Sequence, residues 1–82
     1  MEMTMTLYKD NLSIDNVFNL TGVPKSTLRF WEKSFAEYLT PKRTQGRQRR
    51  YSRDDLQKII TIKQLLTQEG YTIAGARKRL AA

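Results

Sequence analysis

The feature that most constrains the fold is a pair of amphipathic patterns separated by only three residues, Gly22 to Pro24. The first pattern has the i, i+3, i+4, i+7 spacing of one buried helical stripe. Its members are Ile14, Val17, Phe18 and Thr21. Ser13 is the predicted N-cap, Gly22 is predicted to adopt the left-handed C′ conformation, and Pro24 cannot continue the helix. Two short helices joined by a Gly-containing turn are typical of a helix-turn-helix.

The second pattern, KSTLRFWEKSF at residues 25–35, carries two stripes rather than one. Leu28, Trp31 and Phe35 form an apolar stripe that supplies the core. A second stripe repeats the helical spacing but is polar and basic except for one ring, and its members are Ser26, Arg29, Phe30 and Lys33. A helix that only covered a core would not need this second stripe. We therefore predict that Phe30 lies outside the core, between two cations, and that Trp31 is mainly structural.

The next stretch breaks the helical period and predicts a β-hairpin. Residues 39–43 and 48–51 are the predicted strands, with a Gly-containing loop at residues 44–47. Because two strands alone are marginally stable in water, the hairpin must pack on the helices, and Leu39 and Tyr51 are its predicted anchors.

This hairpin region is the most basic part of a chain whose net charge is +7. Six positive charges fall within twelve residues, namely Lys42, Arg43, Arg47, Arg49, Arg50 and Arg53. Such an excess favours polyanionic partners: DNA, RNA or an anionic membrane surface. Arginine predominates, and its planar guanidinium group binds phosphates or guanine edges through two hydrogen bonds. A hairpin that binds phosphates is our interpretation, and a merely solvated run of charge is the alternative.

Two more helices are predicted after the hairpin. Ser52 and Asp55 have the spacing of a capping box, and the helix that follows ends before Gly70. Its predicted buried face consists of Leu56, Ile59, Ile60, Lys63 and Leu66, widened by Ile62 and Leu65. Thr72 is the predicted N-cap of a last short helix that turns Ile73, Ala76 and Leu80 inward. Residues 1–11 have no clear period and are predicted to be disordered, so residues 12–82 form the one expected domain.

Several function classes are excluded by residues that the chain lacks. There is no cysteine and no histidine, which removes thiolate metal sites and the commonest catalytic base and metal ligand. We therefore expect no enzyme, no metal and no cofactor. No apolar run is long enough for a membrane span, and the N-terminus is no secretory signal, so we expect a cytoplasmic protein.

Three stretches together resemble the DNA-binding domain of the MerR family of bacterial transcription regulators. They are TGVPKSTLRFWE, RTQGRQRRYSRDDLQKI and LLTQEGYTIAGARKRL, and the resemblance covers residues 12 to about 80. It implies a mainly α winged helix-turn-helix, with four short helices and a two-stranded wing. It further implies that the second helix enters the major groove and that the wing touches the phosphate backbone of double-stranded DNA. The predicted DNA-binding residues are Lys25, Ser26, Arg29, Phe30, Lys33, Lys42, Arg43, Arg47, Arg49 and Arg50.

The match is imperfect in two places. Family members often carry tyrosine where this chain has Phe30 and Trp31, so the chain lacks a phosphate-contacting hydroxyl at Phe30. The family's usual entry to the wing is also replaced, by EYLTPKR. The resemblance also implies a homodimer through a long helix absent here, a palindromic operator, and RNA polymerase at the promoter. We favour an excised domain over a stand-alone module like the small phage excisionases. Two other classes remain open: a protein-interaction module that docks through Phe30 and Trp31, and RNA or membrane binding through the same arginines.

Overall fold

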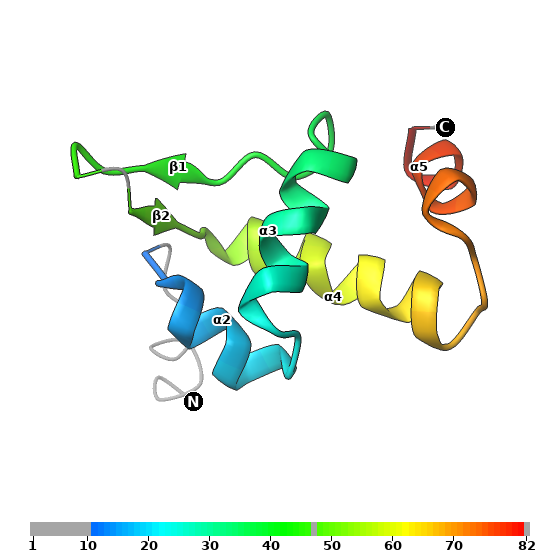
Figure 1. Cartoon of the computed structure of the whole chain (residues 1–82), viewed down its shortest axis with the longest axis horizontal. Helices are drawn as coiled ribbons and strands as arrows, with labels where there is room; N and C mark the ends of the chain where they lie inside the picture. Colours follow the sequence, from blue (N-terminus) through cyan, green and yellow to red (C-terminus); the bar gives the residue numbers. More distant parts are fainter. Residues whose placement is uncertain (1–10, 47, 82) are drawn as a thin grey trace.

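The computed structural model describes residues 11–46 and 48–81, and within them four helices and one two-stranded sheet form (Figure 1). In chain order the elements are α2 (Ile14–Thr21), α3 (Lys25–Ser34), β1 (Lys42–Arg43), β2 (Arg49–Arg50), α4 (Arg53–Thr67) and α5 (Ile73–Ala81). This confirms the predicted winged helix-turn-helix. Disorder is predicted for residues 1–11, and of these, residues 1–10 lie outside the described residues. The predicted DNA-binding residue Arg47 also lies outside them.

The turn between α2 and α3 forms as its residues predict. The Ser13 hydroxyl accepts a hydrogen bond from the Asn16 N–H at 3.1 Å, and the Asn16 side chain accepts one from the Ser13 N–H at 3.0 Å. At the other end Gly22 takes φ +77°, a left-handed conformation that only glycine adopts without strain. Thr21 is buried below this turn, where its hydroxyl donates to the Val17 carbonyl at 2.7 Å and accepts from the Val23 N–H at 3.1 Å.

One member of the first predicted stripe is not buried. Phe18 keeps 40% of its surface exposed, whereas Val17 is fully buried and Thr21 is 8% exposed. Val17 and Thr21 are four residues apart and mark the centre of the buried face, and Phe18 falls about 80° away from that centre on a helix of 3.6 residues per turn. Its assignment to the core was therefore wrong.

Helix α4 starts as predicted, with Ser52 as N-cap: the Asp55 N–H donates to the Ser52 hydroxyl and the Ser52 N–H to the Asp55 carboxylate. Its buried face differs from the prediction. The buried apolar side chains are Leu56, Ile59, Ile62 and Leu65, while Ile60 and Leu66 are only partly buried and Lys63 is exposed. Three-residue steps fall short of a full turn, so this stripe winds around the helix and serves both α2 and α5.

The wing is shorter than predicted: its strands are two residues each instead of five and four. Leu39 ends the turn after α3, since its N–H donates to the Phe35 carbonyl at 2.8 Å, and Pro41 has no N–H to donate. Tyr51 pairs elsewhere, exchanging two backbone hydrogen bonds with Leu12 at 2.8 and 2.9 Å. Both predicted anchors are nevertheless core residues, with Leu39 1% exposed and Tyr51 fully buried.

The elements are arranged so that the wing and α5 extend from opposite ends of the molecule (Figure 1). Helix α3 crosses α4 between them in this view, and α2 lies beside the base of α3. Lys63 links α4 to the end of α2, because its amino group donates to the Thr21 carbonyl at 2.7 Å. The core formed in this way leaves one face of α3 and the whole wing outside it.

Candidate nucleic-acid interface

The exposed face of α3 is the stripe that the sequence sets apart from the core. Leu28 and Trp31 are buried, at 0% and 5% exposure, whereas Phe30 keeps 53% of its surface in solvent. The other members of the stripe, Ser26, Arg29 and Lys33, are also exposed, as is Lys25 at the start of the helix. Phe30 therefore lies outside the core, as predicted, and Trp31 is structural.

The cations on this face differ in what they contact. Lys25 forms an ion pair with Asp15 of α2, and both side chains are well exposed, so this pair adds little to stability. Arg29 and Lys33 form no ion pair with any other described residue. Two positive charges thus flank Phe30 without a protein counter-charge in the described part of the chain.

The wing root is held by one carboxylate, that of Glu32 on the inner side of α3. Glu32 Oε1 lies 3.2 Å from Arg43 Nη2, and Glu32 Oε2 lies 2.5 Å from Arg49 Nε. The Tyr51 hydroxyl donates to Oε2 at 2.8 Å. The Glu32 side chain is only 9% exposed, so the carboxylate is nearly enclosed by these three partners. A residue of α3 therefore fixes the position of the wing.

The contact between Arg49 and Glu32 is an ion pair rather than an aligned hydrogen bond. Arg49 Nε is buried, and among the described residues no acceptor lies in line with its N–H, even though Glu32 Oε2 is close. The attraction is therefore mainly Coulombic, and it is strengthened because the Arg49 side chain is only 22% exposed.

Tyr51 shows the electrostatic effect of this cluster. Burial raises the pKa of the Tyr51 phenol well above its ordinary value of 10.0, and the hydrogen bond to Glu32 raises the pKa further. A phenolate here would be desolvated and would face a carboxylate. Tyr51 is thus a neutral donor under all physiological conditions.

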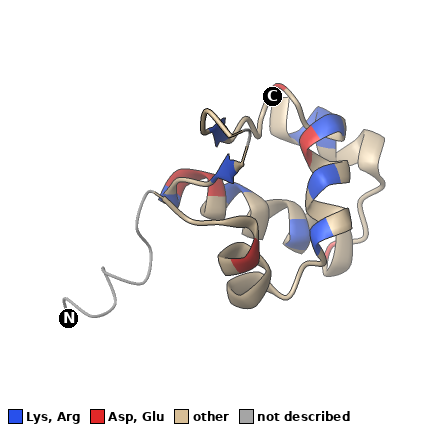
Figure 2. Ribbon diagram, turned by 60° about the vertical axis from the view of Figure 1, so that its left-hand side comes forward, with Lys and Arg blue, Asp and Glu red and all other residues tan. Residues whose placement is uncertain are grey.

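The remaining wing cations are placed differently. Lys42 is exposed, and Arg50 is partly buried with its guanidinium group donating to the Gln48 side-chain carbonyl at 3.3 Å. The side chain of Arg43 is 47% exposed although it is paired with Glu32. Figure 2 shows Lys and Arg on both strands of the wing and the acids on or near the helices. Contact of these residues with DNA stays a prediction.

Glu32 is the residue of this site that the sequence reasoning missed. It is the last residue of the stretch TGVPKSTLRFWE, and the sequence holds a signal for its role. A hairpin whose strands carry only cations needs an acid from elsewhere, and Glu32 lies on the predicted helix that immediately precedes the hairpin.

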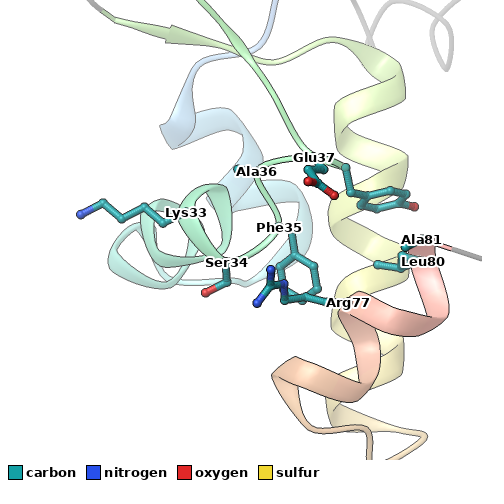
Figure 3. Close-up of a pocket in the computed structure, with 9 residues that line it drawn as sticks. Lys33, Ser34, Phe35, Ala36, Glu37, Arg77, Leu80 and Ala81 are labelled. Carbon is teal, nitrogen blue, oxygen red and sulfur yellow. The ribbon is translucent and has the colours of Figure 1, made fainter.

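A groove of about 460 Å³ lies elsewhere, between the end of α3 and α5 (Figure 3). Phe35, Leu80 and Arg77 line it together with Lys33, whose amino group points toward the outside (Figure 3). The described residues contain no cluster of acids that would hold a metal ion there or anywhere else, and none of their helices is long and apolar enough to cross a membrane.

Comparison with known proteins agrees with this architecture. Residues 12–82 match the family described as MerR HTH family regulatory protein. The chain is 30% identical over 66 residues to the HTH-type transcriptional repressor CarA of Myxococcus xanthus, covering 79% of this chain and 23% of that protein. It is 41% identical over 58 residues to the HTH-type transcriptional regulator YfmP of Bacillus subtilis, covering 67% of this chain and 41% of that protein.

The chain thus spans less than half the length of the curated relatives that it matches. The matched family and both relatives are regulators and not enzymes, in agreement with the expectation from the missing catalytic side chains. The predicted resemblance is confirmed, and the chain belongs to the MerR HTH family of regulatory proteins.

Proposed function

We propose that this chain is the double-stranded DNA-binding domain of a transcription regulator, with α3 in the major groove and the wing on the adjacent phosphate backbone. The observation that carries the proposal is the Glu32 cluster. By holding Arg43 and Arg49 against α3, it fixes a cationic hairpin to the helix whose outer face carries exposed cations and Phe30. A helix and a two-stranded ribbon are the two elements that the major groove admits.

On this proposal the residues form two groups, those that contact base edges and those that contact phosphates. Arg29 and Phe30 face base edges, with the ring of Phe30 suited to thymine methyl groups and sugars. Lys25, Ser26 and Lys33 flank them and contact phosphates, and the wing adds further phosphate contacts. Arg47 belongs to the proposed wing surface by its place in the sequence, and it lies outside the described residues.

Binding should be strongly salt-dependent. If one domain touches about four to six phosphates, the slope of log K against log salt is about −4 to −5, because each neutralised phosphate releases condensed counterions. A flat salt response would contradict a phosphate-binding wing.

The decisive experiment is selection of bound duplexes from a random pool, followed by Arg29→Ala on the recovered site and on random DNA. Loss of one base contact is expected to cost about 1–3 kcal/mol on the selected site and clearly less on random duplex. Equal losses on both would mean that α3 positions the protein without reading sequence.

One observation also suits a protein-interaction module, namely the 53% exposure of Phe30. The rival surface is smaller than the sequence indicated, since Trp31 is buried. A titration with duplex DNA that shifted no wing amide resonance would favour the rival. Competition between duplex DNA, RNA and anionic vesicles at one salt concentration separates the remaining polyanions.

We propose that this domain acts within a regulator of the bacterial cytoplasm that binds a palindromic operator as a homodimer and controls RNA polymerase at a promoter. Support comes from the family and from relatives named as a transcriptional repressor and a transcriptional regulator. A stand-alone excisionase-like module is the alternative, and protection of a single half-site without a dyad by the protein as its own cell expresses it would favour it.

A further inference from the structure

Every residue of the two wing strands is cationic, and both cross-strand pairs oppose like charges. Lys42 pairs with Arg50, and Arg43 pairs with Arg49. Like charges directly opposite each other destabilise a sheet, and a two-stranded hairpin is marginally stable even without that repulsion. The wing therefore depends on counter-charges from outside its own strands.

Arg43 and Arg49, the inner pair, receive such a counter-charge from the protein. Their guanidinium groups lie 3.2 and 2.5 Å from the two oxygens of Glu32. The side chain of Arg49 is 22% exposed, and the carboxylate it faces is 9% exposed. Moving Arg49 to a ligand would leave a nearly buried carboxylate with one cation fewer, so Arg49 is committed to the fold.

Lys42 and Arg50 form the outer pair, which faces away from Glu32. This pair receives no counter-charge from the described residues. Successive side chains on a strand point to opposite faces, so the outer pair projects from the face that does not meet Glu32. None of the ion pairs in the described part of the chain includes either residue, and the hydrogen-bond partner of Arg50 is the neutral amide of Gln48. Two adjacent cations here repel each other without compensation.

We propose that the outer pair is the phosphate-binding site of the wing, and that Arg49 is a positioning residue that holds the hairpin through Glu32. The ligand is a phosphodiester group of the DNA backbone, whose charge lies between Lys42 and Arg50 and replaces their repulsion by attraction. This proposal rests on the proposed DNA-binding function. It implies that DNA stabilises the wing as it binds.

Two adjacent arginines provide a matched comparison. Without DNA, Arg49→Gln is expected to lower Tm by about 5 °C or more because Glu32 loses its closest cation, whereas Arg50→Gln and Lys42→Gln leave Tm within about 2 °C. With duplex DNA, Arg50→Gln and Lys42→Gln each reduce the salt slope by about 0.9, the value for one phosphate. Arg49→Gln weakens binding to all duplexes but keeps the slope of the wild type.

Measured salt slopes decide the assignment. If Arg49→Gln reduces the slope by one phosphate and Arg50→Gln does not, the two faces have been assigned the wrong way round and the proposal is overturned. Equal reductions for both also overturn it. Should Arg49→Gln fail to fold, Arg50→Gln and Lys42→Gln still decide, because an unchanged slope in both variants overturns the proposed site.

Failure of the proposed function itself gives a different result. In that case the wild-type chain binds no duplex with a measurable salt slope, which overturns the phosphate site. The Tm comparison needs no DNA, so a larger loss for Arg49→Gln than for Arg50→Gln still supports the positioning role, and equal losses overturn it.

Discussion

Removing the hydroxyl of Tyr51 tests how much the Glu32 cluster contributes to the fold. In Tyr51→Phe the ring still fills its fully buried position, but Glu32 Oε2 loses the donor that lies 2.8 Å away. Hydrogen bonds to charged groups contribute about 1.5–3 kcal/mol, and the lower half of that range applies because Arg43 and Arg49 still face the carboxylate. The expected loss in the free energy of unfolding is about 2 kcal/mol.

That loss is large for a chain of 82 residues. A domain of this size has a total stability of about 4–12 kcal/mol, and each kilocalorie lost lowers Tm by about 4–8 °C. Tyr51→Phe is thus expected to lower Tm by about 8–16 °C. Urea unfolding followed by far-ultraviolet circular dichroism and by the fluorescence of Trp31, the only tryptophan, measures the free energy directly.

Tyr38→Phe is the matched control. Tyr38 is also partly packed against the core, but its hydroxyl makes no hydrogen bond to another described residue, and its ring contact with the Lys58 ammonium group is kept in phenylalanine. We expect a change within about 0.5 kcal/mol. If the two variants were equally stable, the Tyr51 hydroxyl would have no structural role and the carboxylate would be held by the arginines alone.

Two further predictions follow from the same region and from the α2–α3 turn. Because the pKa of Tyr51 is raised in the folded state, the unfolded chain binds fewer protons above pH 10, and stability falls as pH rises. Between pH 10 and 11 the free energy of unfolding of the wild type, measured in urea, should fall by about 1 kcal/mol more than that of Tyr51→Phe. Gly22→Ala places a side chain at φ +77°, where the nearest atom is 4.0 Å away, so backbone strain alone should cost about 1–2 kcal/mol. Gly46→Ala, without a positive φ and with a nearest contact of 3.8 Å, is its control and should change stability by less than about 0.5 kcal/mol; similar losses for both glycines would contradict the strain argument.

The parts of the fold that the sequence predicts well are those decided within a few residues. The caps at Ser13 and Ser52 and the left-handed Gly22 each depend on neighbours no more than four positions away. Local hydrogen-bonding chemistry is visible in a sequence because the partners are adjacent in it. The two stripes of α3 were predicted correctly for the same reason, since helical spacing alone separates them.

The wing shows why other features were missed. Its strands are short because Tyr51 pairs with Leu12 and because Leu39 turns back to Phe35, and neither contact follows from strand propensity. The register decides which arginines face Glu32, and a slip of one residue would exchange them. Distant partners and register are set by tertiary packing, so a sequence pattern could place the wing charge but could not divide it between two faces.

The pairing of Leu12 with Tyr51 also bears on the order in which the molecule assembles. Synthesis proceeds at about 5–20 residues per second, so Leu12 leaves the ribosome about 2–8 s before the tyrosine that satisfies its backbone. Helices α2 and α3 can collapse on each other within microseconds during that interval. The wing, by contrast, can dock only after Tyr51 has been synthesised and can pair with Leu12, so its docking is expected to be a late step in folding.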